Sequence, residues 1–333
     1  MEAKLFGRLP TGEEVIVYTL KNEYARLRLM TFGAAIVSFE PYGRSIISGF
    51  ASLDNYLTDD SHQGGTVGRV ANRIEGAEFT MDGAIYMLTA NDGDNCLHGG
   101  VGFDRRIWDV EEYTDDSILF SYYSPDGEEG FPSGLLVKVR YTLKDAKVII
   151  SYEAYPDGKT PVSLTNHAYF NLDGFGGTVY GHTARLYAKS YTEVDTSLIP
   201  TGKRLTVFGT EFDFTTPRTI GRDINENFSG YDHSFVLSFE HYREFFGTRV
   251  GLAAVVESGG LRLNVYTDQP CLQFYTGNFL GTGPDFLGGI KQVKHGAFCL
   301  ETQTEPNSVK MGAGLFDVGE VYRHTCVYEI EKI

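Results

Sequence analysis

Short runs of alternating, β-branched and aromatic residues recur along almost the whole chain, and they constrain its fold more than any other feature. The runs are EEVIVYTL, YARLRLMTF, SILFSYYS, LLVKVRYTL, KVIISYEAY, ARLYAKSYTEV, DHSFVLSFE, GLRLNVYTD, PCLQFYTGNF, GAFCLETQ and HTCVYEIEKI. Turn sequences rich in Gly, Asp and Asn separate several of them, such as PDGEEG, PDGK, DGFGG and NDGDN. Many short strands joined by such turns are typical of a large antiparallel sandwich or barrel.

Helical periodicity is weak. Residues 51–59 and 217–224 predict short helical turns, and neither keeps an apolar repeat of 3.6 residues. The 333 residues contain no repeat of fixed period and no Pro/Ser-rich linker, and all-β domains often reach this length. The sequence therefore predicts an all-β protein with one antiparallel β-sandwich domain over residues 1–333.

Charge and composition bear on the partners and the compartment. The chain has 29 Lys and Arg against 44 Asp and Glu, and its formal net charge of −15 disfavours nucleic acid and anionic membranes as partners. Because no stretch approaches eighteen apolar residues and the first residues lack a secretory pattern, we expect no membrane span and a cytoplasmic location. Cysteine spacing predicts reduced thiols, with neither a zinc site nor a disulfide framework: Cys96, Cys271, Cys299 and Cys326.

The segment SLTNHAYFNL (163–172) reads as a strand with a histidine at its centre. Alternation puts mostly apolar side chains on one face and hydrogen-bonding groups on the other: Ser163, Thr165, His167, Tyr169 and Asn171. Hydroxyls, an imidazole, a phenol and an amide on a rigid support suit a small polar ligand. The pattern alone leaves two roles open for His167, a part in such a site or a structural hydrogen bond.

Three further stretches place polar groups in loops or at strand entrances. In GRVANRI, Asn72 and Arg73 offer an amide and a planar cation to hydroxyls or a carboxylate, or Arg73 is a solvated surface charge. In NDGDNCLHGG, His98 precedes two glycines that let the backbone approach a ligand, or it caps its own turn. In SGYDHSFVL, Asp232 enters a strand as a site carboxylate or as an acceptor of turn hydrogen bonds.

Two later strands add polar groups over a packed face. Alternation in PCLQFYTGN sets Gln273 and Tyr275 on one side. In AFCLETQTEPN, alternation makes Glu301 a partly enclosed carboxylate on a rigid strand. Partial burial raises a carboxyl pKa towards neutrality, as a general base at pH 7 requires, unless nearby donors hold it down. Together, the polar strand faces predict a concave site for a polyhydroxylated ligand.

Six motifs in a fixed order carry a resemblance to a known family. NRI, LHGG, TNHAYFNL, GYDHSF, LQFYTGNF and LETQ follow one another between residues 72 and 303. In this order they resemble the galactose mutarotase (aldose 1-epimerase) family, and FGRLPTGEEVIVYTLKN with MTFGAAIVSFE is similar to that family's start. The resemblance implies a large β-sandwich with an open cleft, a small-molecule aldose as substrate, and no metal or cofactor.

Matched motif by motif, the resemblance also implies the roles of seven residues. His167 corresponds to the general acid and Glu301 to the general base. The positions that correspond to sugar contacts are Asn72, Arg73, His98, Asp232 and Gln273. In such a reaction the base takes the proton of the C1 hydroxyl while the acid protonates the ring oxygen, and the free aldehyde recloses as the other anomer. After LETQ, this chain departs from the family's usual Pro-Asp step, which bears on substrate preference and loop geometry.

Other classes of protein use some of the same residues. A glycoside hydrolase would pair Asp232 with Glu301 across a scissile bond, and His167 would then have no evident task. A non-catalytic sugar-binding module would need the polar cleft without a matched acid and base. An epimerase of sugar phosphates would need an added cationic pocket. The sequence leaves open the preferred aldose and the choice between monomer and homodimer.

Overall fold

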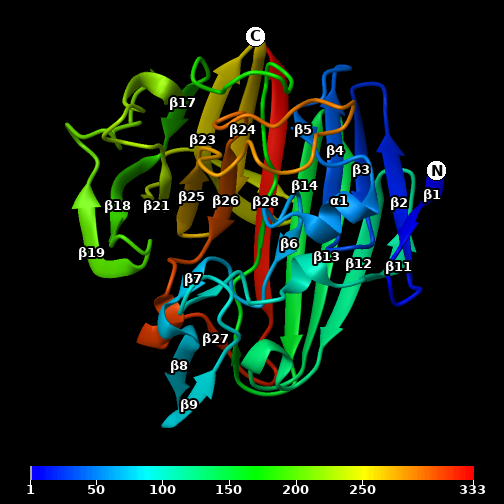
Figure 1. Ribbon diagram of the computed structural model, residues 1–333, viewed down its shortest axis with the longest axis vertical. Coiled ribbons are helices and arrows are strands. Elements are labelled where there is room, and N and C mark those ends of the chain that lie inside the picture. Colours follow the sequence, from blue (N-terminus) through cyan, green and yellow to red (C-terminus); the bar gives the residue numbers. More distant parts are fainter. Residues whose placement is uncertain (1) are drawn as a thin grey trace.

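A computed structural model describes residues 2–333 of the chain as layers of antiparallel β-sheet (Figure 1). The largest sheet has ten strands. In spatial order they are β11 (Asp109–Tyr113), β12 (Ser117–Ser124), β13 (Leu135–Lys144), β14 (Lys147–Pro156), β28 (Tyr322–Lys332), β24 (Leu261–Thr267), β23 (Thr248–Ser258), β17 (Thr183–Leu186) and β20 (Arg218–Thr219), with β22 (Tyr242–Phe245) paired to β23. The predicted all-β sandwich is therefore confirmed.

Two five-stranded sheets and four short ladders make up the remaining strands. One five-stranded sheet contains β1 (Glu2–Arg8), β2 (Glu14–Lys21), β3 (Ala25–Met30), β4 (Ala35–Pro41) and β5 (Ile47–Ser48). The other runs β19 (Pro200–Thr206), β18 (Ala188–Val194), β21 (Asp232–Leu237), β25 (Cys271–Tyr275) and β26 (Cys299–Gln303). The ladders are β6 (Thr66–Val67) with β16 (Thr165–Asn166), β7 (Arg73–Ile74) with β10 (Cys96–Leu97), β8 (Glu78–Met81) with β9 (Ala84–Met87), and β15 (Thr160–Pro161) with β27 (Leu315–Phe316).

Helical structure is limited to short pieces. The α-helix α1 (Leu53–Thr58) begins at Ser52, whose hydroxyl accepts the N–H of Asn55. The 3-10 turns are η1 (Glu75–Ala77), η2 (Phe103–Arg105), η3 (Glu128–Gly130), η4 (Ile220–Arg222) and η5 (Ser308–Met311). The helical turns predicted at 51–59 and 217–224 correspond to α1 and η4. Among residues 2–333, no helix has the length and apolar content that a membrane crossing needs.

The main core lies between the ten-stranded sheet and the two five-stranded sheets. Alternate residues of β13 are buried, so that Val137 and Val139 face the core while their neighbours are partly exposed. The same cluster takes Leu27 from β3 and Leu272 from β25. Burial of the apolar faces of all three sheets in one cluster holds the layers together. In Figure 1 the long strands β13, β14 and β28 run between β2–β4 on one side and β18, β19 and β21 on the other.

The prediction that residues 163–172 form a strand was wrong for most of the segment. Only Thr165 and Asn166 belong to a strand, β16, and every residue of the segment is buried. The backbone bonds to several different partners, since Phe170 pairs with Phe298 and the N–H of Asn171 donates to the carbonyl of Ile46. The segment crosses the core and links several sheets, so no single ladder can form along it.

Candidate active site

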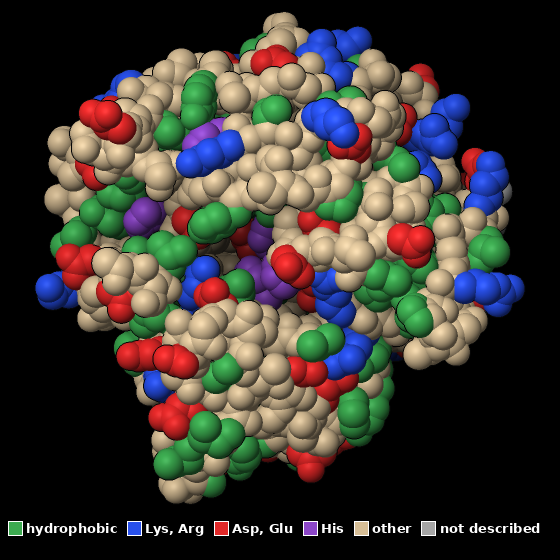
Figure 2. Space-filling model, viewed as in Figure 1, with side chains coloured by type: hydrophobic (Ala, Val, Ile, Leu, Met, Phe, Trp, Pro, Cys, Tyr) green, Lys and Arg blue, Asp and Glu red, His purple; other side chains and the backbone are tan. Residues whose placement is uncertain are grey.

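A cavity of about 740 Å³ opens on the face of the molecule shown in Figure 2, with histidine side chains visible inside the hollow. Its walls come from parts of the chain that are far apart in sequence: the loop after α1, the β7/β10 ladder, the segment around His167, and strands β21, β25 and β26. All seven residues predicted for the site line it: Asn72, Arg73, His98, His167, Asp232, Gln273 and Glu301. The fold thus brings the whole predicted set to one place.

The short β7/β10 ladder positions three of these side chains. It pairs Arg73 with Leu97, which sets Asn72 beside His98. The His98 N–H donates to the Asn72 carbonyl, and the Asn72 N–H donates to Nδ1 of His98, each over 3.1 Å. Nε of Arg73 donates to Oδ2 of Asp92 at 2.7 Å, which fixes the plane of the guanidinium at the cavity wall.

Strands β21, β25 and β26 supply the carboxyl and amide groups of the opposite wall. Gln273 stands opposite Glu301 in the β25/β26 register. Directly opposite residues of antiparallel strands project from the same face, so both side chains reach the cavity. Nε2 of Gln273 donates to Oδ1 of Asp232 at 2.7 Å, which orients both groups. Glu301 is only 2% exposed, so the enclosure expected from the sequence is nearly complete.

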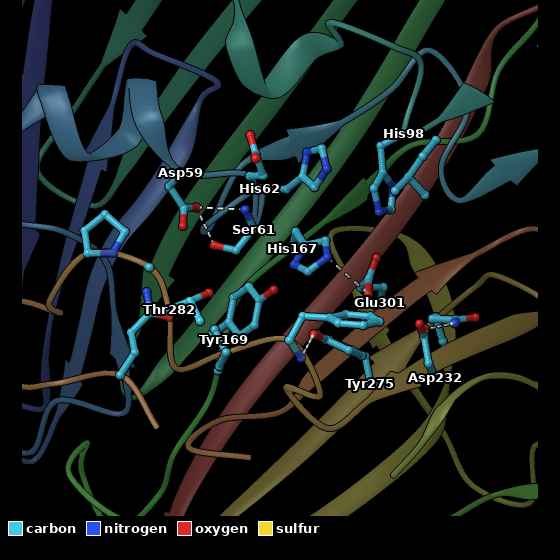
Figure 3. Close-up of a pocket in the computed structure, with 18 of the residues that line it drawn as sticks. Asp59, Ser61, His62, His98, His167, Tyr169, Asp232, Tyr275, Thr282 and Glu301 are labelled. Atoms are coloured by element: carbon cyan, nitrogen blue, oxygen red, sulfur yellow. Dashed lines mark hydrogen bonds and ion pairs between the residues drawn. The ribbon is translucent and has the colours of Figure 1, made fainter. Parts of the chain in front are cut away.

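His167 lies just beyond β16 and faces Glu301 (Figure 3). Its ring stacks on Tyr169 with centroids 5.0 Å apart, and its Nδ1 lies 3.6 Å from Sγ of Cys299. The other ring nitrogen, Nε2, lies 3.7 Å from Oε1 of Glu301. A basic nitrogen and a carboxyl oxygen therefore meet inside the cavity at a distance that a sugar oxygen can bridge.

Burial sets the proton state of this pair. Burial, and after it the nearby His62, lowers the pKa of His167 to about 3. Burial also raises the pKa of Glu301 well above its ordinary value, with a further rise from Asp232 and an opposing effect of Arg73. Both shifts favour the uncharged forms of the two groups.

Three residues have the chemistry of a metal-binding set. Ligand atoms of His98, His167 and Glu301 all lie within 4.8 Å of one another. A histidine that binds a metal usually donates its other ring N–H to an acceptor. Nδ1 of His98 instead accepts the Asn72 N–H, which places the ring proton on Nε2, the atom that faces the cavity. The neighbours of His98 thus prepare it to donate a hydrogen bond, and they disfavour its use as a ligand.

Several residues that line the cavity were not predicted from the sequence, among them His62 and Phe279. His62, in the loop between α1 and β6, lines it beside His98 and His167. Phe279, with 73% of its surface exposed, lies at its rim. The SHQGG sequence around His62 has no periodic pattern from which a role could be inferred, and Phe279, although part of the LQFYTGNF motif, was not named as a site residue. Together, the β-sandwich, the open polar cavity and the buried His–Glu pair are the features of a carbohydrate-active protein.

Comparison with known proteins identifies the family. The family model described as aldose 1-epimerase matches residues 17–329. The galactose mutarotase of Sus scrofa is 41% identical, with 96% of each chain covered, and the aldose 1-epimerase of Escherichia coli is 38% identical, with 90% of this chain and 89% of that one covered. The crystal structure of galactose 1-epimerase from Lactobacillus acidophilus superposes with a TM-score of 0.87 at 27% identity, over 99% of this chain and 98% of that one. The chain belongs to the aldose 1-epimerase family.

Proposed function

We propose that this aldose 1-epimerase interconverts the α and β anomers of free aldohexoses such as galactose and glucose, with Glu301 and His167 as its acid–base pair. The observation that carries the proposal is the buried approach of Nε2 of His167 to Oε1 of Glu301, 3.7 Å apart within a polar cavity. Opening a sugar ring at C1 needs one group that removes the O1 proton and another that protonates the ring oxygen. The pair supplies both groups within the reach of one bound sugar.

The proton inventory of the pair suits a reversible reaction. Glu301 acts as base when its carboxyl is ionised, and His167 acts as acid when its ring is protonated. The shifted pKa values favour the uncharged pair in the free cavity, and transfer of the carboxyl proton to the imidazole gives the active arrangement. The pair has no net charge in either arrangement, and no proton has to come from solvent. After rotation about C1–C2, the two groups exchange roles and close the ring.

The remaining groups fit the demands of orientation and charge. His98 offers an N–H to a sugar oxygen, and the guanidinium of Arg73, held by Asp92, adds a fixed positive charge beside oxygen that gains negative charge. Asp232 and Gln273, joined by a hydrogen bond, offer acceptors and donors to ring hydroxyls. A hydrolytic role for Asp232 and Glu301 would leave the close approach of His167 without a function.

Polarimetry of freshly dissolved α-D-galactose tests the proposal. Wild type, His167→Asn and Glu301→Gln are compared in buffer treated with a chelator, and His241→Asn, which changes an exposed histidine outside the cavity, is the matched control. We expect wild type and control to accelerate the loss of rotation, and both site variants to stay near the spontaneous rate. Equal activity in wild type and Glu301→Gln would overturn the assignment, and a wild type at the spontaneous rate with every aldohexose would overturn the function.

A further inference from the structure

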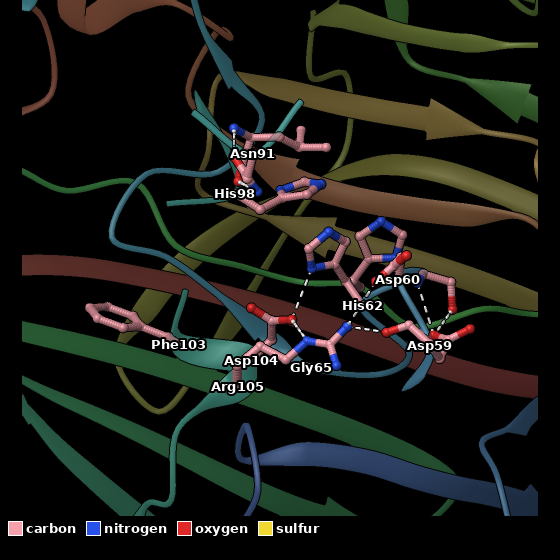
Figure 4. Close-up of polar contacts among 12 residues, drawn as sticks. Asp59, Asp60, His62, Gly65, Asn91, His98, Phe103, Asp104 and Arg105 are labelled. Carbon is pink, nitrogen blue, oxygen red and sulfur yellow. Dashed lines mark hydrogen bonds and ion pairs between the residues drawn. The ribbon is translucent and has the colours of Figure 1, made fainter. Parts of the chain in front are cut away.

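His62 is the third histidine of the cavity, and the acid–base chemistry above gives it no role. Its ring centroid lies 4.6 Å from that of His98 and 5.8 Å from that of His167 (Figure 4). Its backbone has φ of +55°, in the left-handed region that residues other than glycine seldom adopt. Strained residues that face a ligand cavity often serve the site, because the surrounding structure has to hold them there.

Asp104 holds the His62 ring from behind. Nδ1 of His62 lies 2.9 Å from Oδ2 of Asp104, whose side chain is 2% exposed. Burial acts to raise the pKa of Asp104, but the neighbouring His62 and Arg105 hold it below its ordinary value, so the group is a carboxylate. A carboxylate only accepts hydrogen bonds, which places a proton on Nδ1 of His62. The contact also requires Gly65, since a Cβ there would lie 2.6 Å from Cβ of Asp104.

Arg105 forms an ion pair with Asp104 and fixes the loop that carries His62. Its Nε lies 3.5 Å from Oδ2 of Asp104, and its other N–H groups donate to the carbonyls of Tyr56 and Asp59. Since Nδ1 of His62 is held by Asp104, Nε2 is the ring nitrogen left to face the cavity, and in the tautomer with its single proton on Nδ1 it accepts a hydrogen bond.

His62 and His98 therefore present opposite hydrogen-bonding characters. Nδ1 of His98 accepts the Asn72 N–H, so its Nε2 carries a proton and donates. The two rings meet edge to face, at 67° to one another, on the same wall of the cavity. A hydroxyl group both donates and accepts, and it is the sugar substituent that satisfies an acceptor and a donor placed side by side.

We propose that His62, oriented by Asp104, is a further sugar-contacting residue, and that its Nε2 and the Nε2–H of His98 together bind one hydroxyl of the aldose. The inference rests on the proposed function for the identity of the ligand. A site with buried polar groups rejects an analogue that lacks the matching hydroxyl, because those groups are left unpaired. The His62–His98 pair thus selects aldoses that carry this hydroxyl, and it leaves the proton transfers to His167 and Glu301.

Two substitutions distinguish the hydrogen bond between His62 and Asp104 from the proposed contact of His62 with the sugar. In His62→Asn, the amide nitrogen takes the place of Nδ1 and keeps the bond to Asp104, but no atom reaches the position of Nε2. In His62→Gln, the longer side chain brings an amide oxygen near that position. For His62→Asn we expect KM for galactose to rise about three- to tenfold, the range of one net hydrogen bond, while kcat changes less than about twofold. We expect His62→Gln to recover much of the loss, and His241→Asn to match wild type.

Galactoses that lack one hydroxyl identify the group bound. With wild type, we expect one monodeoxy analogue to have a higher KM than galactose. In His62→Asn, we expect the ratio of these two KM values to be at least about threefold smaller, because the variant has already lost the contact with that hydroxyl. Calorimetric Kd values for galactose give a second measurement that needs no turnover. An inactive wild type that binds galactose more tightly than His62→Asn does would overturn the proposed function alone. Two results would overturn the inference about His62. One is an active wild type whose KM and Kd for galactose match those of His62→Asn, and the other is that His62→Asn weakens the binding of galactose and of every monodeoxy analogue by the same factor.

Discussion

Nε2 of His167 faces Oε1 of Glu301 across 3.7 Å, and both side chains are almost completely buried. The two residues come from different layers of the fold, one from the segment after β16 and the other from β26. The shifted pKa values of the two groups both favour their uncharged forms. The first two predictions follow from this relationship.

Loss of either member of the pair removes one proton transfer. We expect kcat of His167→Asn and of Glu301→Gln to fall about 10²–10⁴-fold, the usual contribution of one general acid or base, with a smaller effect on KM. The kcat of the double variant should be little lower than that of the less active single variant, because the effects of substituting two residues that act as a unit are not additive. Steady-state polarimetry measures all three, and a double variant whose losses multiply would show that the two act independently.

The pH profile should lack an acid limb near the ordinary histidine pKa. In acid, the pair stops working when it gains a second proton, at the His167 pKa of about 3. In base, it stops when it loses its only proton, at the raised pKa of Glu301. We therefore expect kcat/KM, corrected for spontaneous mutarotation, not to fall as the pH is lowered from about 7 to about 5. A fall centred near pH 6.5 would show that His167 titrates as an exposed histidine does.

His324 links the stability of the fold to pH. Burial lowers its pKa to about 4, and its ring stacks on Tyr152 and bonds to Thr302. The unfolded chain binds a proton at this residue near pH 6.5 and the folded chain does not, so stability is lost as the pH falls below that value. Between pH 7 and pH 5, we expect the loss in the free energy of unfolding to be about 2 kcal/mol smaller in His324→Gln than in wild type. Urea unfolding at the two pH values measures it, and equal losses would contradict the prediction.

Arg69 stabilises the turn between β12 and β13. It is 2% exposed, and its guanidinium donates to the carbonyls of Pro132, Ser133 and Pro125 and to hydroxyl and carbonyl oxygens of Ser124. Lysine keeps the charge but has fewer donors and no planar fork. We expect Arg69→Lys to lower the free energy of unfolding by about 3–6 kcal/mol, the contribution of two hydrogen bonds to a charged group at about 1.5–3 kcal/mol each. Arg26→Lys, on the partly exposed surface of β3, is the control, and equal stability of the two variants would refute the role of Arg69.

Local pattern predicted the bounds of several strands. The run SILFSYYS has the same bounds as β12, and LLVKVRYTL differs from β13 by one residue. Strand β23 was missed because its centre, buried on both faces, is rich in Gly and Ala, and such a run lacks both alternation and bulky β-formers. The run ARLYAKSYTEV contains two strands, because the chain leaves one sheet at Tyr187 and enters another.

Some site residues could likewise be predicted from local sequence, and others could not. Motifs on strands and tight turns identified candidates such as Glu301 and His98, and the resemblance assigned their roles. His62 was missed because its partner Asp104 is 42 residues away, and no local pattern encodes that approach. The distance between His167 and Glu301 depends on how three layers pack, which neither segment specifies alone.

The segment 163–172 carries side chains of the core and of the cavity on the same ten buried residues. Substitutions there change the packing, and at His167 and Tyr169 they change the lining of the cavity as well, so natural variation in the segment faces two constraints. Phe279, at the exposed rim, faces neither constraint to the same degree. We therefore expect related proteins with different sugar preferences to differ mainly in the residues at the rim of this cavity and to share the residues of its floor.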